Sequence, residues 1–208
     1  MNLIAFLTNQ RGWRIWSVVC KWILESIYNV SVGKHFYCEG VPRLRLRGAP
    51  INISIGDDVK ILGPIDLRTR EAGAIRIGNN VTVERECRFV SARDGIINIG
   101  NDTVIGAYAI WNGGADIAIG EKCLFGVRSS INSNDHKVGR QVPIRDQGFV
   151  HAAITIEEDC WFGANVSINK GCLIKKGSVV AANAVVTKDT DQYSINAGVP
   201  ASKIGERS

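Results

Sequence analysis

The chain has 208 residues, of which 45% are hydrophobic and 22% charged, the ordinary composition of a single soluble domain. Its net charge of +5 at pH 7 suits an acidic ligand or an anionic surface, but it is too small to indicate a nucleic-acid partner. The six cysteines form no Cys-x-x-Cys pair, which argues against zinc and redox motifs and favours a reduced, cytoplasmic compartment.

The first 32 residues predict one amphipathic helix and no membrane span. Apolar residues three or four positions apart form one stripe: Trp13, Trp16, Cys20, Ile23, Ile27 and Val30. The charged residues Arg14, Lys21 and Glu25 interrupt the run too often for a spanning helix. The helix therefore either covers the open end of the domain that follows or lies on a membrane surface. The apolar segment Met1–Leu7 is too short for a secretory signal and lacks a basic lead.

Residues 33–50 show no evident repeat, and we expect them to complete an irregular N-terminal cap over residues 1–50. Within them Arg43, Arg45 and Arg47 alternate with leucine. This alternation is typical of a strand with one basic face.

From residue 51 to about residue 205 the chain repeats with a period of six. The clearest run places an apolar residue at every sixth position: Ile156, Phe162, Ile168, Ile174, Val180 and Val186. A small or apolar residue recurs four places after these, at Cys160, Val166, Cys172, Ser178 and Ala184. A six-residue period is the signature of a parallel β-helix, in which three short strands complete one coil. We expect both sets to point into the core, together with Cys87 and Cys123, which occupy the same position in earlier repeats.

The repeat breaks once, from about residue 133 to 153, and resumes at Ile154. This break predicts one long loop that projects from a coil. The sequence therefore predicts an all-β domain over residues 51–205, preceded by an amphipathic helix and interrupted by a loop at 133–153.

Three segments beyond the loop carry a family resemblance. Residues 154–166 read I-T-I-E-E-D-C-W-F-G-A-N-V, residues 185–189 read V-V-T-K-D, and residues 198–201 read G-V-P-A. They resemble motifs of the hexapeptide-repeat acyltransferases, especially the sugar O-acetyltransferases. The resemblance implies a left-handed parallel β-helix, acetyl-CoA as acyl donor, and a homotrimer with active sites between subunits.

The same resemblance singles out His136, since Asn134-Asp135-His136 stands where the family places its catalytic histidine. A histidine suits the role of general base towards an acceptor hydroxyl, without a covalent acyl-enzyme. Asp135 or Asn134 would orient the imidazole, although an Asn-Asp pair also favours a plain turn. Asn112, about one coil earlier, belongs either to the same cleft or only to a turn.

The resemblance also implies residues that bind the donor. Trp161 should face outward, either beside the pantetheine arm of acetyl-CoA or in a subunit contact. Backbone groups at four positions are candidate partners of that arm: Gly163, Ala164, Ala181 and Ala182. Thr187 and Lys188 would meet the phosphates or the adenine of the coenzyme.

Three functions fit this sequence. The preferred one is an acetyl-CoA-dependent O-acetyltransferase that acts on a sugar hydroxyl of a surface polysaccharide or its precursor, at the inner face of the membrane if the helix binds lipid. The second is an N-acetyltransferase for a nucleotide-linked amino sugar, and the third is a trimeric scaffold without catalysis. A zinc-dependent carbonic anhydrase of this fold would need three converging histidines, and we do not expect His35, His136 and His151 to converge, so no metal is expected. His151 either contacts the substrate or is structural.

Overall fold

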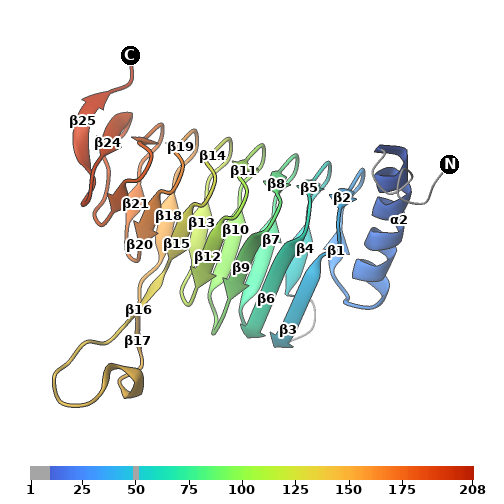
Figure 1. Cartoon of the computed structure of the whole chain (residues 1–208), viewed down its shortest axis with the longest axis horizontal. Coiled ribbons are helices and arrows are strands. Elements are labelled where there is room, and N and C mark those ends of the chain that lie inside the picture. Colours follow the sequence, from blue (N-terminus) through green and yellow to red (C-terminus); the bar gives the residue numbers. More distant parts are fainter. Residues whose placement is uncertain (1–9, 49–51) are drawn as a thin grey trace.

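The computed structural model describes residues 10–48 and 52–208, so the segment Met1–Leu7 lies outside the described residues. The described chain forms a left-handed parallel β-helix, with α2 (Gln10–Ser26) at its N-terminal end (Figure 1). The predicted fold class is therefore confirmed.

Three sheets run along the axis, and each coil contributes one strand to each of them; the strands pair in parallel except β25 (Ser202–Glu206), which is antiparallel to β24 (Ser194–Ala197). Sheet A contains β1 (Ser31–Val32), β4 (Ile53–Ile55), β7 (Ala74–Ile77), β10 (Ile96–Ile99), β13 (Ile117–Ile119), β18 (Ile154–Ile156) and β21 (Leu173–Ile174). Sheet B contains β2 (Tyr37–Glu39), β5 (Lys60–Leu62), β8 (Thr82–Glu84), β11 (Val104–Ile105), β14 (Leu124–Phe125), β19 (Trp161–Phe162), β22 (Val179–Val180), β24 (Ser194–Ala197) and β25 (Ser202–Glu206). Sheet C contains β3 (Arg43–Gly48), β6 (Ile65–Glu71), β9 (Cys87–Ser91), β12 (Ile110–Gly113), β15 (Ser130–Asn132), β20 (Ser167–Asn169) and β23 (Val185–Val186).

The core is a column of inward side chains that follows the six-residue period. All the inward positions predicted between Ile156 and Val186 are at most 2% exposed. The predicted inward cysteines are buried as well, and the six thiols of the chain are free. Burial raises the pKa of the Cys87 thiol to about 11, as expected for a small core residue rather than a reactive one.

Aromatic rings stack along part of this core. The ring centroids of Phe89 and Trp111 lie 4.7 Å apart, those of Trp111 and Phe125 4.9 Å, and those of Phe125 and Phe162 4.6 Å. Each ring belongs to a different coil, so the stack fixes the spacing of the middle coils from the inside.

Residues 31–48 form a regular coil, which differs from the irregular segment expected there. Val32, Cys38 and Leu44 pair in register with Ile55, Ile61 and Leu67 of the next coil. Val32, Cys38 and Leu44 are each six positions apart in the sequence, so they follow the six-residue period of the domain. Arg43–Gly48 is a strand with alternating exposure, as its arginine pattern predicted.

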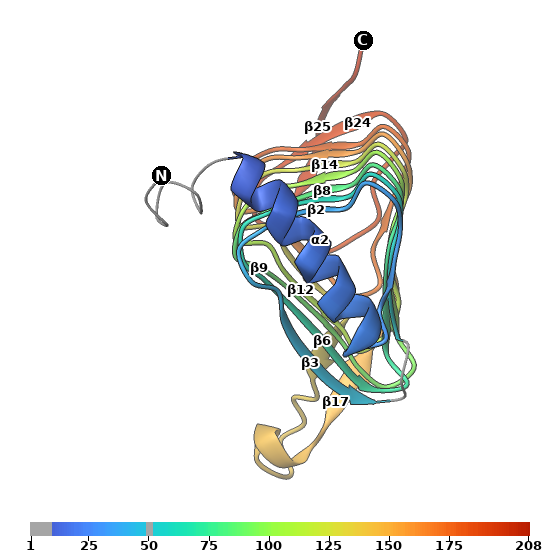
Figure 2. The same cartoon turned by 90° about the vertical axis from the view of Figure 1, so that its right-hand side faces the viewer.

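Helix α2 covers the open end of the first coil (Figure 2). Its buried side includes Cys20 and Leu24, and the Trp16 indole N–H donates to the Gly40 carbonyl at 2.7 Å. The helix ends at Ser26, before Ile27 and Val30 of the predicted stripe. Within the described residues, no helix is both long enough and apolar enough to cross a membrane.

The predicted loop at 133–153 projects from the coil as a hairpin (Figure 1). Strand β16 (Asn134–His136) pairs in antiparallel fashion with β17 (Phe149–His151), and a short 3-10 helix, η1 (Ile144–Asp146), lies in the connection. The hairpin leaves the coil at the corner between sheets C and A, which determines where its side chains lie.

Because Phe162 is fully buried in the aromatic stack, Phe162→Ala should lower the free energy of unfolding by about 3–5 kcal/mol. Ile204→Ala is the control, since Ile204 is 66% exposed and its loss should change stability by less than about 0.5 kcal/mol. Urea denaturation of both variants measures the difference. A loss below about 1 kcal/mol for Phe162→Ala would show that the stack does not hold the coils together.

Candidate active site

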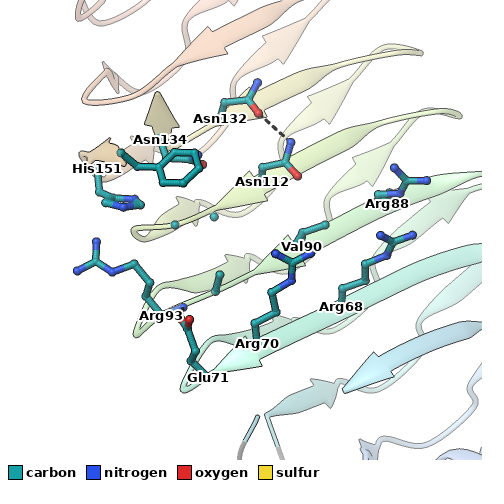
Figure 3. A pocket seen from close by; sticks show the side chains of 14 residues that line it. Arg68, Arg70, Glu71, Arg88, Val90, Arg93, Asn112, Asn132, Asn134 and His151 are labelled. Atoms are coloured by element: carbon teal, nitrogen blue, oxygen red, sulfur yellow. Dashed lines mark hydrogen bonds between the residues drawn. The ribbon is translucent and has the colours of Figure 1, made fainter. Parts of the chain in front are cut away.

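Side chains on the outer face of sheet C lie in columns along the axis, because each coil pairs in register with the next. One column contains, from the N-terminal coil onward, Arg45, Arg68, Val90, Asn112, Asn132 and Asn169. Neighbouring strands are about 4.8 Å apart, so along the column two arginines are followed, after Val90, by a stretch of amides. The Asn112 amide N–H donates to the Asn132 side-chain oxygen at 2.8 Å (Figure 3).

The hairpin adds a wall to this face. Asn134 lies opposite His151, and His136 lies opposite Phe149. On each strand of the hairpin the two residues of these pairs are two positions apart, so all four side chains point to the same side of the hairpin. The ring centroid of Phe149 is 4.3 Å from that of His136 and 6.0 Å from that of His151. Two imidazoles thus lie around one phenyl ring.

A cavity of about 500 Å³ lies where sheet C meets the hairpin. One end is lined by amides and an imidazole, from Asn112, Asn132, Asn134 and His151 (Figure 3). The other end, on the earlier coils, is basic and carries Arg68, Arg70, Arg88 and Arg93 spread across it, with Arg93 and Glu71 on the side of His151. Phe149 also lines the cavity, and His136, which packs on Phe149, is exposed one row further out.

His151 is the half-buried imidazole of this cavity. Its Nδ1 is buried and has no hydrogen-bond partner among the described residues. Gly114 lies directly beside the ring, since a Cβ at that position would be only 2.5 Å from Nδ1. A buried polar atom without a partner costs about 1–3 kcal/mol, and a polar ligand in the cavity would remove that cost.

At the basic end Asp66 holds two of the arginines. Arg68 donates to both Asp66 carboxylate oxygens, at 2.8 and 2.5 Å, and Arg88 donates to one of them at 3.3 Å. The Arg68 hydrogen bonds keep the pKa of Asp66 below its ordinary value, so the carboxylate stays ionised. The guanidinium groups of Arg70 and Arg93 have no ion-pair partner within residues 10–48 and 52–208.

The structure places the predicted catalytic residues on two sides of the hairpin. His136 and Asn134 share the side that faces the cavity, where Asn112 also lies. Asp135 points to the other side, and its carboxylate accepts a hydrogen bond from Lys170 Nζ at 2.5 Å. Its predicted contact with the imidazole of His136 is thus replaced by an ion pair. The catalytic roles of His136 and Asn112 stay predictions.

Five of the predicted donor-binding residues gather at the corner between sheets B and C. Gly163 stacks on Ala182 of the next coil, because a Cβ on Gly163 would lie 2.5 Å from the Ala182 nitrogen. The amides of Gly163 and Ala181 donate to carbonyls of neighbouring strands at 2.8 Å. Those of Ala164 and Ala182 donate to no group of the described chain. Trp161 stands beside this corner and is 54% exposed, so its outward position is confirmed.

Thr187 and Lys188 lie apart from that corner. Both are exposed and line a small surface pocket just beyond β23, together with Asp189 and Lys203. Thr187, Lys188 and Trp161 are not among the residues that line the cavity beside the hairpin. Within the described residues, Lys188 forms no ion pair that would occupy its ammonium group.

The three histidines do not converge. His35 lies in the first coil, where its Nδ1 is 3.0 Å from the Asp58 carboxylate, whereas His136 and His151 lie on the hairpin. Among the described residues there is also no cluster of three metal-ligating side chains. This arrangement does not fit a three-histidine zinc centre.

Sequence reasoning did not single out the cavity arginines or Phe149. A signal existed for two of them, because Arg68 and Arg70 alternate with Leu67 and Thr69 in the manner noted for Arg43, Arg45 and Arg47. The alternation predicts an outward basic face. Only the register of the coils shows that this face continues into Asn112 and the hairpin.

Comparison with known proteins agrees with this geometry. Residues 153–188 match the family model described as "Bacterial transferase hexapeptide (six repeats)". The chain is 30% identical over 168 residues to a probable acetyltransferase of Mycobacterium tuberculosis, covering 80% of this chain but only 53%, about half, of that protein. It is 29% identical over 191 residues to galactoside O-acetyltransferase of Escherichia coli, covering 85% of this chain and 87% of that one.

The chain therefore resembles the hexapeptide-repeat acyltransferases over most of its length. An N-acyltransferase from Bacillus cereus, solved with dTDP-4-amino-4,6-dideoxyglucose and coenzyme A, has the same fold, with a TM-score of 0.61 and 22% identity over 86% of this chain and 84% of that one. The similarity to named acyltransferases favours an enzyme over a purely structural scaffold.

Gly114→Ala should lower kcat/KM of the acyltransferase for its acceptor by about 10–100-fold. The added methyl group would collide with His151 Nδ1 and displace the imidazole within the cavity. Steady-state kinetics should show an unchanged KM for the acyl donor, since the corner of Trp161 is not touched. Gly205→Ala is the control, because the nearest atom to its Cβ would be 3.9 Å away. Equal kinetics of both variants would remove His151 from the acceptor site.

Proposed function

We propose that the enzyme transfers an acetyl group from acetyl-CoA to a hydroxyl of a sugar in a surface polysaccharide or its precursor. The observation that carries the proposal is the polar cavity beside the hairpin, where His151 and the amide of Asn112 line a space for a polyhydroxylated ligand and His136 packs on Phe149 at its edge. The similarity over most of both chains to a galactoside O-acetyltransferase supports a sugar as acceptor.

The proposed chemistry uses one protein base. His136 takes the proton of the acceptor hydroxyl while the hydroxyl oxygen attacks the thioester carbonyl carbon of acetyl-CoA. The tetrahedral intermediate expels the CoA thiolate, which recovers the proton from the imidazolium. The products are the O-acetyl ester and free CoA, and no acyl group is held by the enzyme. The amides of Asn112 and Asn132 are placed to bind neighbouring sugar hydroxyls.

The alternative acceptor is the amine of a nucleotide-linked amino sugar. The basic end of the cavity favours it, since four arginines suit a charged nucleotide better than a neutral sugar. The same fold in an N-acyltransferase that binds such a sugar is compatible with it. Mass spectrometry of the products formed from hydroxyl and amino acceptors offered in parallel distinguishes the two, because an ester is cleaved by mild base and an amide is not.

His136→Ala should lower kcat by about 100–10,000-fold, the usual effect of losing a general base. Circular dichroism should show an unchanged fold, because His136 is exposed. His35→Ala is the control, since His35 lies in the first coil. Near-normal turnover of His136→Ala would exclude it as the base, and a full loss in His151→Ala instead would transfer that role to His151.

For the donor, we propose that the corner around Trp161 binds the pantetheine arm and that Lys188 binds a phosphate of the coenzyme. The free amides of Ala164 and Ala182 would donate to the amide oxygens of the arm. Lys188 is exposed and has no ion pair in the described chain, so its ammonium group is available as a point charge.

The Trp161 group and the hairpin occupy different corners of the coil, which leads us to propose a homotrimer with active sites between subunits. Sheet B supports such a contact, because Val104, Leu124 and Trp161 form one outward column of exposed apolar side chains. Such a continuous apolar column is expected at a subunit interface. The hairpin of one subunit would then meet the Trp161 corner of the next.

Lys188→Glu should raise the KM for acetyl-CoA by about tenfold or more, because it replaces a phosphate contact by a like charge. Mixing this variant with His136→Ala gives the sharper test. If each active site takes His136 from one subunit and Lys188 from its neighbour, mixed trimers contain some intact sites and regain activity. If the mixture of the two variants stays inactive after their subunits have exchanged, the arrangement is wrong. A monomer in light scattering would also contradict it.

We further propose that the exposed side of α2 rests on an anionic lipid surface. Ile15, Val18 and Trp22 are each at least 57% exposed and lie on one side of the helix. The arginines of β3, the outermost strand of sheet C, lie at the same end of the molecule and would meet acidic headgroups.

Replacing Val18 and Trp22 together by serine should abolish flotation with anionic vesicles, whereas zwitterionic vesicles should bind neither protein. Val138→Ser is the control, since Val138 is equally exposed but lies on the hairpin. A wild-type protein that stays wholly unbound would refute lipid binding. Concentration-dependent assembly that Val18→Ser/Trp22→Ser abolishes would instead assign the face to a second copy of the chain.

A further inference from the structure

The basic end of the cavity carries more positive charge than a neutral sugar requires. Four arginines and a single glutamate line it. The Glu71 carboxylate is already engaged, because it accepts the backbone N–H of Arg93 at 2.5 Å. Asp66 neutralises part of this charge by pairing with Arg68 and Arg88, and the positive charge that remains favours an anionic ligand at this end.

The arginines are also held ready for such a ligand. Asp66 accepts hydrogen bonds from Arg68 and Arg88, and both arginines line the cavity. The side chains of Asp66 and Arg68 are only 15% and 20% exposed, so this ion pair is firmly packed. Arg70 and Arg93 also line this end of the cavity, and neither forms an ion pair with another residue of the described chain. Binding an anion here would need little reordering of side chains.

We propose that this end of the cavity binds a phosphate or diphosphate ester on the acceptor sugar, while the sugar itself lies against Asn112 and His151. The inference rests on the proposed function, because it names the class of acceptor for the same site. Guanidinium forks match the oxygens of phosphate in pairs, and a phosphate offers enough oxygens for several arginines at once.

The dimensions of the cavity agree with such an acceptor. Arg68 and Asn112 belong to the same outward column and are separated by two coil intervals, or about 10 Å. This interval suits a sugar whose phosphate ester lies at one end and whose reacting group lies at the other. The reacting group would then point to the hairpin that carries His136.

Two natural sources share this chemistry, a nucleoside-diphosphate sugar and a sugar linked through diphosphate to a lipid. Both present the same anion next to the sugar. They differ in what lies beyond it, a nucleoside or a lipid chain, and separate arms of the experiment therefore compare them.

The first measurement is direct binding of inorganic pyrophosphate to the full-length protein by isothermal titration calorimetry. Arg70→Gln/Arg93→Gln should weaken binding by about tenfold or more for each lost guanidinium group. Arg76→Gln is the control, because Arg76 is exposed on sheet A, away from the cavity. If pyrophosphate does not bind, or if it binds the double variant as tightly as the wild type, the proposal is wrong.

The second measurement is acetyl transfer to one sugar offered as its neutral methyl glycoside, its 1-phosphate, its nucleoside diphosphate and its lipid diphosphate. For wild type, phosphorylated acceptors should have the higher kcat/KM, and Arg70→Gln/Arg93→Gln should lose that advantage, with a larger loss on the phosphorylated acceptors than on the glycoside. The better of the last two acceptors identifies the source. An equal loss on the neutral glycoside, or a raised KM for acetyl-CoA, would overturn the assignment of the arginines to the acceptor.

The two measurements separate this inference from the function on which it rests. Transfer to neutral sugars without arginine-dependent pyrophosphate binding would leave the acetyltransferase proposal intact and refute the phosphate site. Pyrophosphate binding that depends on Arg70 and Arg93, without transfer to any acceptor, would support the anion site and count against the proposed reaction.

Discussion

Hydrogen bonding between successive coils in a fixed register is the constraint on which this molecule depends. Each coil pairs with its neighbours on all three sheets, so an inward position in one coil lies above an inward position in the next. Apolar side chains at these positions fill the axis, and the pairing satisfies the backbone groups. The outward positions form columns as a consequence. A site on this fold is therefore made along a column rather than within a loop.

The outer face of sheet C shows how a single column changes character along the axis. Arginines occupy the first coils and asparagines the later ones, with Val90 between them. Beside this column, the half-buried carboxylate of Asp66 accepts hydrogen bonds from two guanidinium groups, those of Arg68 and Arg88. The hairpin then adds the imidazoles at the end where the amides begin. The register of the backbone therefore keeps the arginines of sheet C apart from the imidazoles of the hairpin.

The period of six made the fold and the core readable from the sequence. Positions such as Phe162 and Val186 could be assigned inward because each hexad repeats the same local geometry. The first coil was missed although Val32, Cys38 and Leu44 follow the same period, because residues between them lack the regular small and apolar pattern. His136 was selected through its motif, and its catalytic role stays a prediction. The cavity arginines were not selected and the role of His151 was left open, since corners of unequal length hide which outward residues share a column.

The order of features along the axis favours one direction for an acceptor. Helix α2 lies at one end, the arginine-rich strands β3, β6 and β9 come next, and the hairpin lies beyond β12 (Figure 1). An acceptor anchored in a membrane would approach from the end of α2, place its phosphate groups among the arginines, and extend its sugar towards His151. A free nucleotide sugar has no such restriction. The arrangement of α2 and the basic end along one axis is therefore easier to explain for a lipid-linked acceptor, because that acceptor needs both.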